Sequence, residues 1–198
     1  MKTESLMTDY SGFERRRLSA EETRDAILAI SGELDPTPGR GHPFPSPVTS
    51  SYTQHAPFSG VYDHNQRSVY LMTQRLKRHP FLALFDGPDP NASTADRRIT
   101  TVPTQALYFL NSPFVHEKSA KCASRLRSAC ADEPQRIELA WRLTTGRAPT
   151  ESERTEATEF LAAYRAELLI AGQTDPEPVA LAAYVRSLFA SNEFLHLD

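Results

Sequence analysis

Proline placement is the feature that most constrains how this chain can fold. The sequence of 198 residues contains 15 prolines, and eleven of them fall between Pro36 and Pro113. Proline fixes its own backbone dihedral angle and cannot donate a backbone hydrogen bond, so dense prolines exclude long regular elements. The other four lie near expected helix starts, at Pro134, Pro149, Pro176 and Pro178. The distribution therefore predicts an irregular first half and a helical second half.

Helix start and stop signals are frequent after residue 100. Helices are expected to begin near Pro103 and after four capping residues, Ser112, Asp132, Thr150 and Asp175. Gly146 and Gly172 stand where helices should end. Apolar residues recur every three or four positions in these segments, which predicts amphipathic helices packed as a bundle.

The first half offers one clear helix and one short strand pattern. Ser19 and Glu22 have capping-box spacing, and the helical repeat behind them is Thr23, Ile27, Ile30 and Leu34, with Gly32 weakening the last turn. From 35 to 66 no period is sustained, which predicts a long surface loop. The alternation in "RSVYLMT", residues 67–73, predicts a short β-strand.

Together these patterns predict a mainly α fold. We expect a helical bundle in the C-terminal half, and a long proline-rich loop region with a short β segment in the N-terminal half. Residues 1–12 are expected to be a disordered tail, and 13–198 a single domain. Within that domain the helix and loop-rich part spans 13–100 and the helical bundle part spans 101–198.

Composition excludes several functional classes. The net charge is −3, so no large basic surface for nucleic acid is expected. No run of about 18 apolar residues exists, which predicts no membrane insertion. The N-terminus lacks a signal-peptide apolar region, so the chain expressed as written would be cytoplasmic.

Cys122 and Cys130, eight residues apart in one expected helix, would lie about 12 Å apart, too far for a disulfide.

The stretch "LFDGPDPNASTADRRITTVP", residues 84–103, carries the candidate binding residues. These are Asp86, Asp89, Asn91, Arg97 and Arg98. We favour a structural interpretation, in which the acidic residues form turns and pair with the two arginines. The alternatives are a clamp for an anionic ligand or carbohydrate, and a site for a hard cation such as calcium.

Other chemistry has little support in the sequence. No catalytic residue, metal ligand set or cofactor is predicted, because the histidines form no HExxH motif and no G-x-S-x-G nucleophile motif occurs. A zinc site built from His55, Asp63 and His64 is a minor alternative. Trp141, Phe160 and Tyr164 fall at helical positions and are most simply core residues.

Several long motifs occur in the order seen in a planctomycete domain of unknown function, family 1553. They are "RRRLSAEETRDAILAISGEL", "RSVYLMTQR", "PFLALFDGPDPN", "RRITTVPTQALYFLNSPFV", "AWRLTTGRAPTESE" and "LFASNEFLHLD". The chain resembles the C-terminal part of that domain over residues 13–198, N-terminally truncated. The resemblance implies a place at the end of large exported proteins, in the periplasm or outside the cell. It supplies no catalytic residues.

We therefore expect a non-catalytic C-terminal module of an exported planctomycete-type protein. It would support a larger assembly, contacting other domains or chains, or bind an extracellular carbohydrate or anionic ligand. One alternative is an enzyme acting on a glycan-like substrate, with Asp86 and Asp89 as acid and base in a deep pocket. Another is an incomplete fragment with an exposed apolar patch near 13–34. A binding module predicts a shallow polar groove flanked by residues 36–66.

Overall fold

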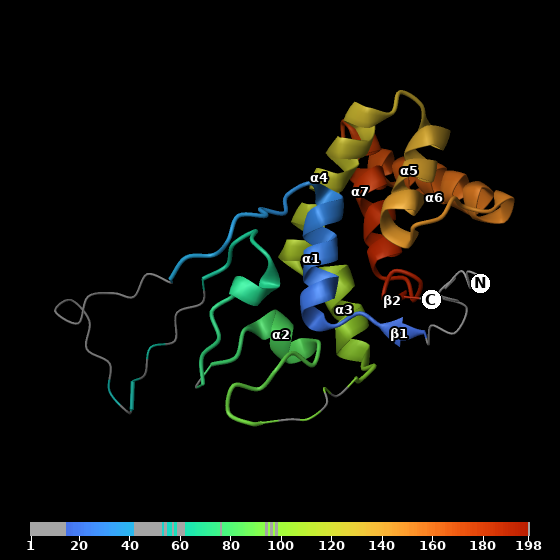
Figure 1. Cartoon of the computed structure of the whole chain (residues 1–198). Helices are drawn as coiled ribbons and strands as arrows, with labels where there is room; N and C mark the ends of the chain where they lie inside the picture. Colours follow the sequence, from blue (N-terminus) through green and yellow to red (C-terminus); the bar gives the residue numbers. More distant parts are fainter. Residues whose placement is uncertain are drawn as a thin grey trace, which may run out of the picture.

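The computed structural model describes residues 15–41, 53, 55–56, 58, 62–75, 77–93, 95, 97 and 99–197. The predicted tail over 1–12 lies outside the described residues. The described part is mainly helical, as predicted (Figure 1). Its α-helices are α1 (Ala20–Ser31), α2 (Pro80–Leu84), α3 (Pro103–Asn111), α4 (Pro113–Ala129), α5 (Glu133–Thr145), α6 (Glu151–Ile170) and α7 (Pro176–Phe189).

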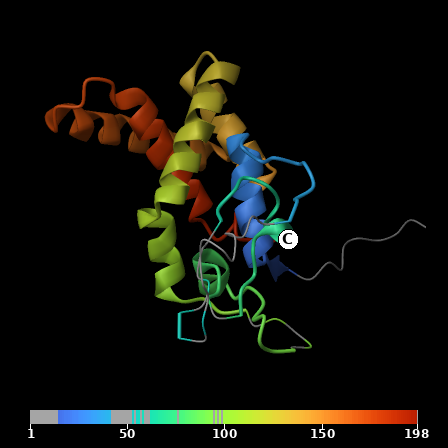
Figure 2. The ribbon, with the colours of Figure 1, turned by 90° about the vertical axis from the view of Figure 1, so that its left-hand side faces the viewer.

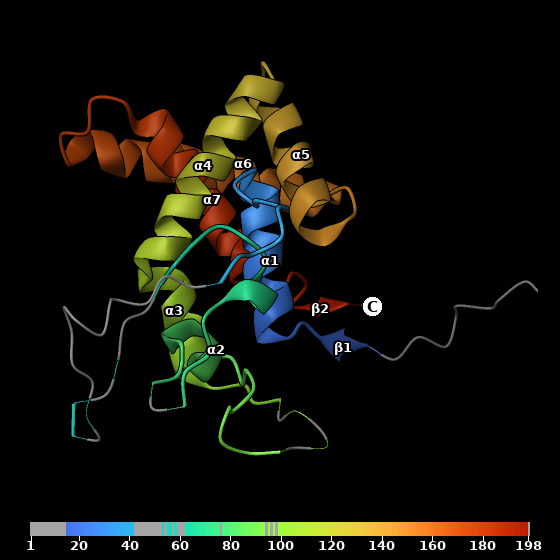
Figure 3. The ribbon, with the colours of Figure 1, turned by 60° about the vertical axis from the view of Figure 1, so that its left-hand side comes forward.

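Helix α4 is the centre of the molecule. It packs along α1 and α7, and α7 in turn packs on α6. Figure 3 shows α1 beside α4, with α5 and α6 toward one end of the bundle and α7 running alongside α4, as in the rotated view of Figure 2. The fully buried side chains of α1, α3, α4 and α7 include Ile27, Phe109, Val115, Leu126 and Phe189. Burial of such side chains is the main favourable contribution to folding.

The predicted capping residues are confirmed in three of five cases. The side chains of Ser19, Asp132 and Thr150 accept hydrogen bonds from the first turns of α1, α5 and α6. Ser112 and Asp175 occupy the capping positions of α4 and α7, but their side chains make no capping hydrogen bond. The first backbone N–H groups of α4 are therefore not satisfied by its capping residue.

Helix α1 ends earlier than its apolar repeat suggests. Gly32 adopts a φ of 79°, and its N–H bonds to the carbonyl oxygen of Ala29 at 3.1 Å. Glycine enters this left-handed region without the steric penalty of a side chain, so Gly32 terminates the helix instead of weakening it. Leu34 lies beyond the helix, where its N–H bonds to Leu28.

The short β segment lies at a different place from the predicted strand. Strands β1 (Arg16–Arg17) and β2 (His196–Leu197) pair antiparallel, to the right of the start of α1 in Figure 1. The strand prediction for 67–73 is wrong, because Ser68–Tyr70 forms the 3-10 helix η2. The carboxylate of Asp25 accepts hydrogen bonds from the Ser68 backbone at 2.7 Å and hydroxyl at 2.6 Å, which holds this turn against α1.

The two cysteines are free, as their spacing predicts. Cys122 is buried within α4, and Cys130 immediately follows that helix.

Among the described residues, no helix combines the length and the apolar character needed to cross a membrane.

Candidate functional site

Asp86 closes the predicted loop on itself. Its Oδ2 atom accepts hydrogen bonds from the backbone N–H and the hydroxyl of Thr100, each at 2.8 Å. The exposed Asp89 bonds within its own turn, since its Oδ1 accepts from the N–H of Asn91 at 2.9 Å. The predicted turn-forming role is therefore observed for Asp89, whereas Asp86 bonds across the loop to a residue 14 positions away.

Arg97 pairs outside its loop and not with Asp86 or Asp89, so the structural interpretation is wrong for this arginine. Its guanidinium donates to Oε2 of Glu21 at 2.5 Å, in the first turn of α1. The fold brings the end of the loop to α1, which offers a carboxylate that sequence spacing does not reveal. Arg98 lies outside the described residues.

The four predicted binding residues that the structure describes, Asp86, Asp89, Asn91 and Arg97, do not line one cavity. Asp86 and Arg97 line a small hollow of about 220 Å³ beside β1. Asn91 instead donates to the carbonyl oxygen of Arg75 at 2.7 Å. A ligand-binding role for this set stays a prediction.

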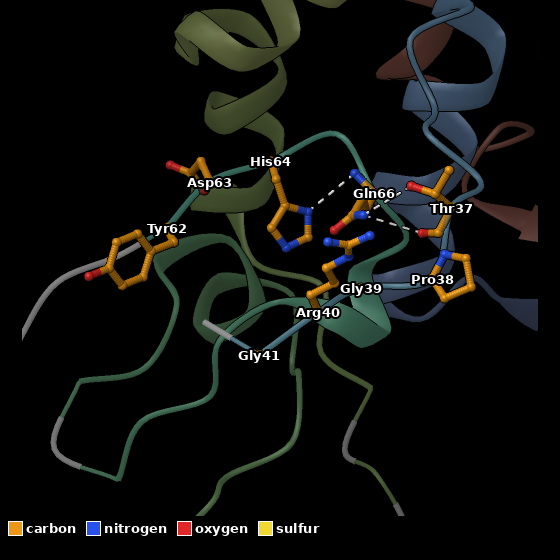
Figure 4. Close-up of a pocket in the computed structure, with 9 residues that line it drawn as sticks. All are labelled: Thr37, Pro38, Gly39, Arg40, Gly41, Tyr62, Asp63, His64 and Gln66. Atoms are coloured by element: carbon orange, nitrogen blue, oxygen red, sulfur yellow. Dashed lines mark hydrogen bonds between the residues drawn. The ribbon is translucent and has the colours of Figure 1, made fainter. Parts of the chain in front are cut away.

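A larger groove lies along the proline-rich segment. It has a volume of about 730 Å³ and is lined by residues 37–41, 62–64 and 66. Figure 4 shows Thr37 and Pro38 at one end of the groove and Tyr62 at the other. The amide of Gln66 donates to the Thr37 hydroxyl at 3.2 Å and joins the two segments.

A second cavity adjoins this groove and shares Asp63 and His64 with it. Its volume is about 570 Å³, and we call it the α1–α4 cleft. Besides the two shared residues, the side chains that line the cleft include Arg24, His79, Phe81, Tyr108, Phe114 and Lys118. They come from α1, from the chain around α2, and from the junction of α3 with α4.

Arg24 is an almost completely buried cation at the cleft, with only 4% of its surface exposed. Its guanidinium donates to the carbonyl oxygens of His64 and Gln66 and to the Ser68 hydroxyl, all of them uncharged acceptors. Burial lowers the pKa of Arg24, while the charges of Asp25 and other neighbours raise it. An arginine stays protonated under these conditions, so the cleft contains a buried positive charge.

Lys118 is a second buried cation, 3% exposed. Its Nζ lies 2.7 Å from Oε1 of Glu117 and 3.7 Å from Oε2 of Glu33. Both cations lie over the ring of Phe114, with Arg24 at 5.6 Å and Lys118 at 5.8 Å from the ring centroid. Such cation–π contacts orient both charges around one aromatic side chain.

Comparison with known families identifies the type of domain. The model of PSD1, described as a protein of unknown function (DUF1553), matches residues 4–161, which is more than half of the chain. The chain belongs to the PSD1 family. No curated protein and no solved structure matches this PSD1 domain.

His79 completes the polar side of the cleft in this PSD1 domain. It is 8% exposed, and its Nε2 lies 2.9 Å from Oδ1 of the exposed Asp63. Its Nδ1 is buried without a hydrogen-bond partner. Tyr108 also lines the cleft. Burial raises the pKa of its phenol, and a hydrogen bond with Ser112 partly offsets that rise.

Among the described residues, no group of three potential ligands could hold a metal ion, so the zinc alternative gains no support.

Sequence reasoning missed the α1–α4 cleft. Its residues form no catalytic or ligand-binding motif and come from segments up to 94 positions apart, from Arg24 to Lys118. One signal was available, because Lys118 falls three residues after Val115 and beside Ser119 on the apolar repeat of α4. A lysine at such a position indicates a buried charge, and a buried charge needs a partner or a ligand.

Proposed function

We propose that this PSD1 domain is a non-catalytic module that binds a carbohydrate-type ligand in the α1–α4 cleft and the adjoining groove. The observation that carries the proposal is the continuity of the two cavities through Asp63 and His64. The described residues 37–41, 62–64 and 66 line the first cavity, which supports the groove beside this segment that a binding module predicts. Cavities of several hundred cubic ångströms are typical of small-ligand sites.

The placement of the loop acids supports binding over glycan hydrolysis. A glycosidase places two carboxyl groups on opposite sides of the scissile bond. Here the Asp86 carboxylate bonds to Thr100, while Asp89 bonds within its own turn and does not line the hollow that contains Asp86.

The packing of α1 supports a module over an incomplete fragment. Ile27, Leu28 and Ile30 are all buried, so the described part of residues 13–34 shows no large exposed apolar side chain.

A contact with other domains or chains is a second role. Leu107 and Leu110, one turn apart on α3, are each 53% exposed. Exposed apolar side chains that recur on one helix face favour a protein contact. Export, to the periplasm or outside the cell, rests on the resemblance of the motif order to terminal domains of exported planctomycete proteins.

The predicted loop residues define a competing location for the ligand. They are Asp86, Asp89, Asn91, Arg97 and Arg98. Asp86 and Arg97 share a hollow, which supports a smaller anion or carbohydrate contact there.

A nuclear magnetic resonance titration tests both the function and its location. The isotope-labelled full chain is titrated with galactotriose and with trigalacturonate. We expect shifts of the backbone amides of Asn65, His79 and Phe114, and an unaltered sugar after prolonged incubation. Asn65→Ala should weaken binding severalfold, whereas Asn91→Ala should not.

Two results would contradict the proposal. Shifts confined to residues 86–100, with Asn91→Ala as the weakened variant, would place the ligand on the loop. Cleavage of either sugar by the purified chain would show catalysis.

A further inference from the structure

We infer that the α1–α4 cleft recognises one singly charged acidic group of a sugar, a carboxylate or a sulfate ester, through Arg24 and Lys118. The inference rests on the proposed binding function and names the class of ligand for the same cleft. It follows from the two buried cations, the start of α4, the neighbouring acidic residues and the aromatic lining.

Arg24 supplies a guanidinium with spare donors. Its hydrogen bonds to His64, Gln66 and Ser68 employ three of the five N–H groups that arginine carries. None of these acceptors is a carboxylate, so no direct ion pair balances the charge. A buried cation without a direct ion pair is unfavourable, and an anion entering the cleft would reduce that penalty.

Lys118 and the start of α4 add positive potential near Arg24. Lys118 and Arg24 both lie over Phe114, which is in the first turn of α4 and lines the cleft. The N-terminal end of a helix carries a partial positive charge. The side chain of Ser112 does not cap these first N–H groups. A ligand oxygen near Phe114 would meet one helix end and two cations.

Neighbouring acidic residues limit the charge of the ligand to one. Glu117 lines the cleft and lies 2.7 Å from Lys118, and Asp63 lines it beside His79. A phosphate monoester carries a charge of about −1.5 to −2 near neutral pH, so these carboxylates would repel it more strongly. A carboxylate or a sulfate ester carries a single negative charge.

The remaining lining is suited to a sugar ring. Phe81 and Tyr108 pack edge to face with centroids 5.5 Å apart, and both line the cleft with Phe114. Aromatic surfaces pack against the apolar C–H faces of sugars. Asp63 and Asn65 provide hydrogen-bonding atoms at the rim for hydroxyl groups.

Calorimetric titration of the full chain with three matched trisaccharides tests the inference. The probes are trigalacturonate, galactotriose sulfated at C6, and neutral galactotriose, which share one ring configuration and differ at C6. We expect at least one acidic probe to bind about tenfold tighter than the neutral one. Raising the salt concentration should reduce that preference, because it screens charge.

Two lysines of α4 provide a matched pair of variants. Lys118→Met removes the buried charge and should abolish the roughly tenfold preference. Lys121 also faces Glu33, at 3.6 Å, but is half-exposed and does not line the cleft, so Lys121→Met should retain the preference. Arg24→Lys keeps the charge but loses the planar fork, and should reduce the preference even if Lys118→Met does not fold.

The outcomes separate the inference from the proposed function. Equal affinity for neutral and acidic probes would overturn the inference while leaving the binding function intact. Absence of binding to all three would overturn both. A folded Lys118→Met variant that keeps the full preference would also overturn the inference. A preference for only one acidic probe supports it and identifies the acidic group.

Discussion

The carboxylate of Asp86 joins the two ends of the loop formed by residues 86–100. It accepts two hydrogen bonds from Thr100, each 2.8 Å long. Asp86 itself has a φ of 58°, in the left-handed region where aspartate and asparagine are tolerated better than most side chains. One residue therefore provides both the turn at the start of the loop and the bond to its end.

We expect Asp86→Ala to lower the free energy of unfolding by about 2–3 kcal/mol, because it removes both bonds and leaves a less suitable residue at positive φ. Asp86→Asn should lower it by about 1 kcal/mol, since asparagine keeps the backbone tolerance and one acceptor. Urea unfolding measures both. Asp89→Ala, at an exposed carboxylate in the same loop, is the control and should change stability by about 0.5 kcal/mol. Similar losses for Asp86→Ala and Asp89→Ala would argue against the closing role.

Gly87 is required by close contact with Leu82 rather than by its backbone angles. An added β-carbon would lie 2.7 Å from both the Cβ and the carbonyl oxygen of Leu82. That oxygen also accepts the Gly87 N–H at 2.6 Å, so neither group has room to move. Gly87→Ala should lower the unfolding free energy by about 1–3 kcal/mol. Gly41→Ala, where a β-carbon meets nothing within 4 Å, should be nearly neutral, and equal melting temperatures for the two variants would contradict this account.

The Cys122 thiol should make the protein less stable in alkaline solution. Burial raises its pKa from 9.0 to about 11. Between these values the unfolded chain loses the thiol proton while the folded chain retains it, so rising pH favours unfolding. The stabilising contribution is complete below pH 9, and the loss reaches about 2–3 kcal/mol by pH 11. Unfolding curves from pH 8 to 11 should show a weaker decline for Cys122→Ala than for the original chain.

Glu153 should contribute to unfolding in acid. Hydrogen bonds from Arg147, with further bonds from Thr150, lower the pKa of Glu153 from 4.5 to about 2. The unfolded chain takes up this proton near pH 4.5 and the folded chain only near pH 2, so stability is lost as pH falls through this interval. Trp141 is the sole tryptophan and lies against Arg147, at 4.7 Å, so its fluorescence reports the transition.

The matched variants for this acid prediction are Glu153→Gln and Glu159→Gln, both on α6. Glu153→Gln should be less stable at pH 7 and should lose less stability between pH 5 and pH 2. Glu159 is exposed, and its variant should follow the original chain. An unchanged acid dependence in Glu153→Gln would exclude the Arg147 pair as its source.

The sequence alone determined the local elements in this PSD1 domain. Capping and termination depend on residues within one turn of each other, which is why Ser19, Asp132, Thr150 and Gly146 predicted the observed helix ends. The free cysteines followed in the same way from their spacing along α4. The strand pattern at 67–73 failed because Asp25, 43 positions from Ser68, holds that segment in a turn.

Only the tertiary structure decided the long-range pairings. Arg97 pairs with Glu21 at a separation of 76 residues, although nearer acidic residues were available. The α1–α4 cleft likewise exists only because helix packing brings Arg24 beside Phe114 and Lys118. Local propensity is set by neighbours along the chain. The partner of a buried charge is set by which helices pack together to bury apolar surface, and no short motif records that choice.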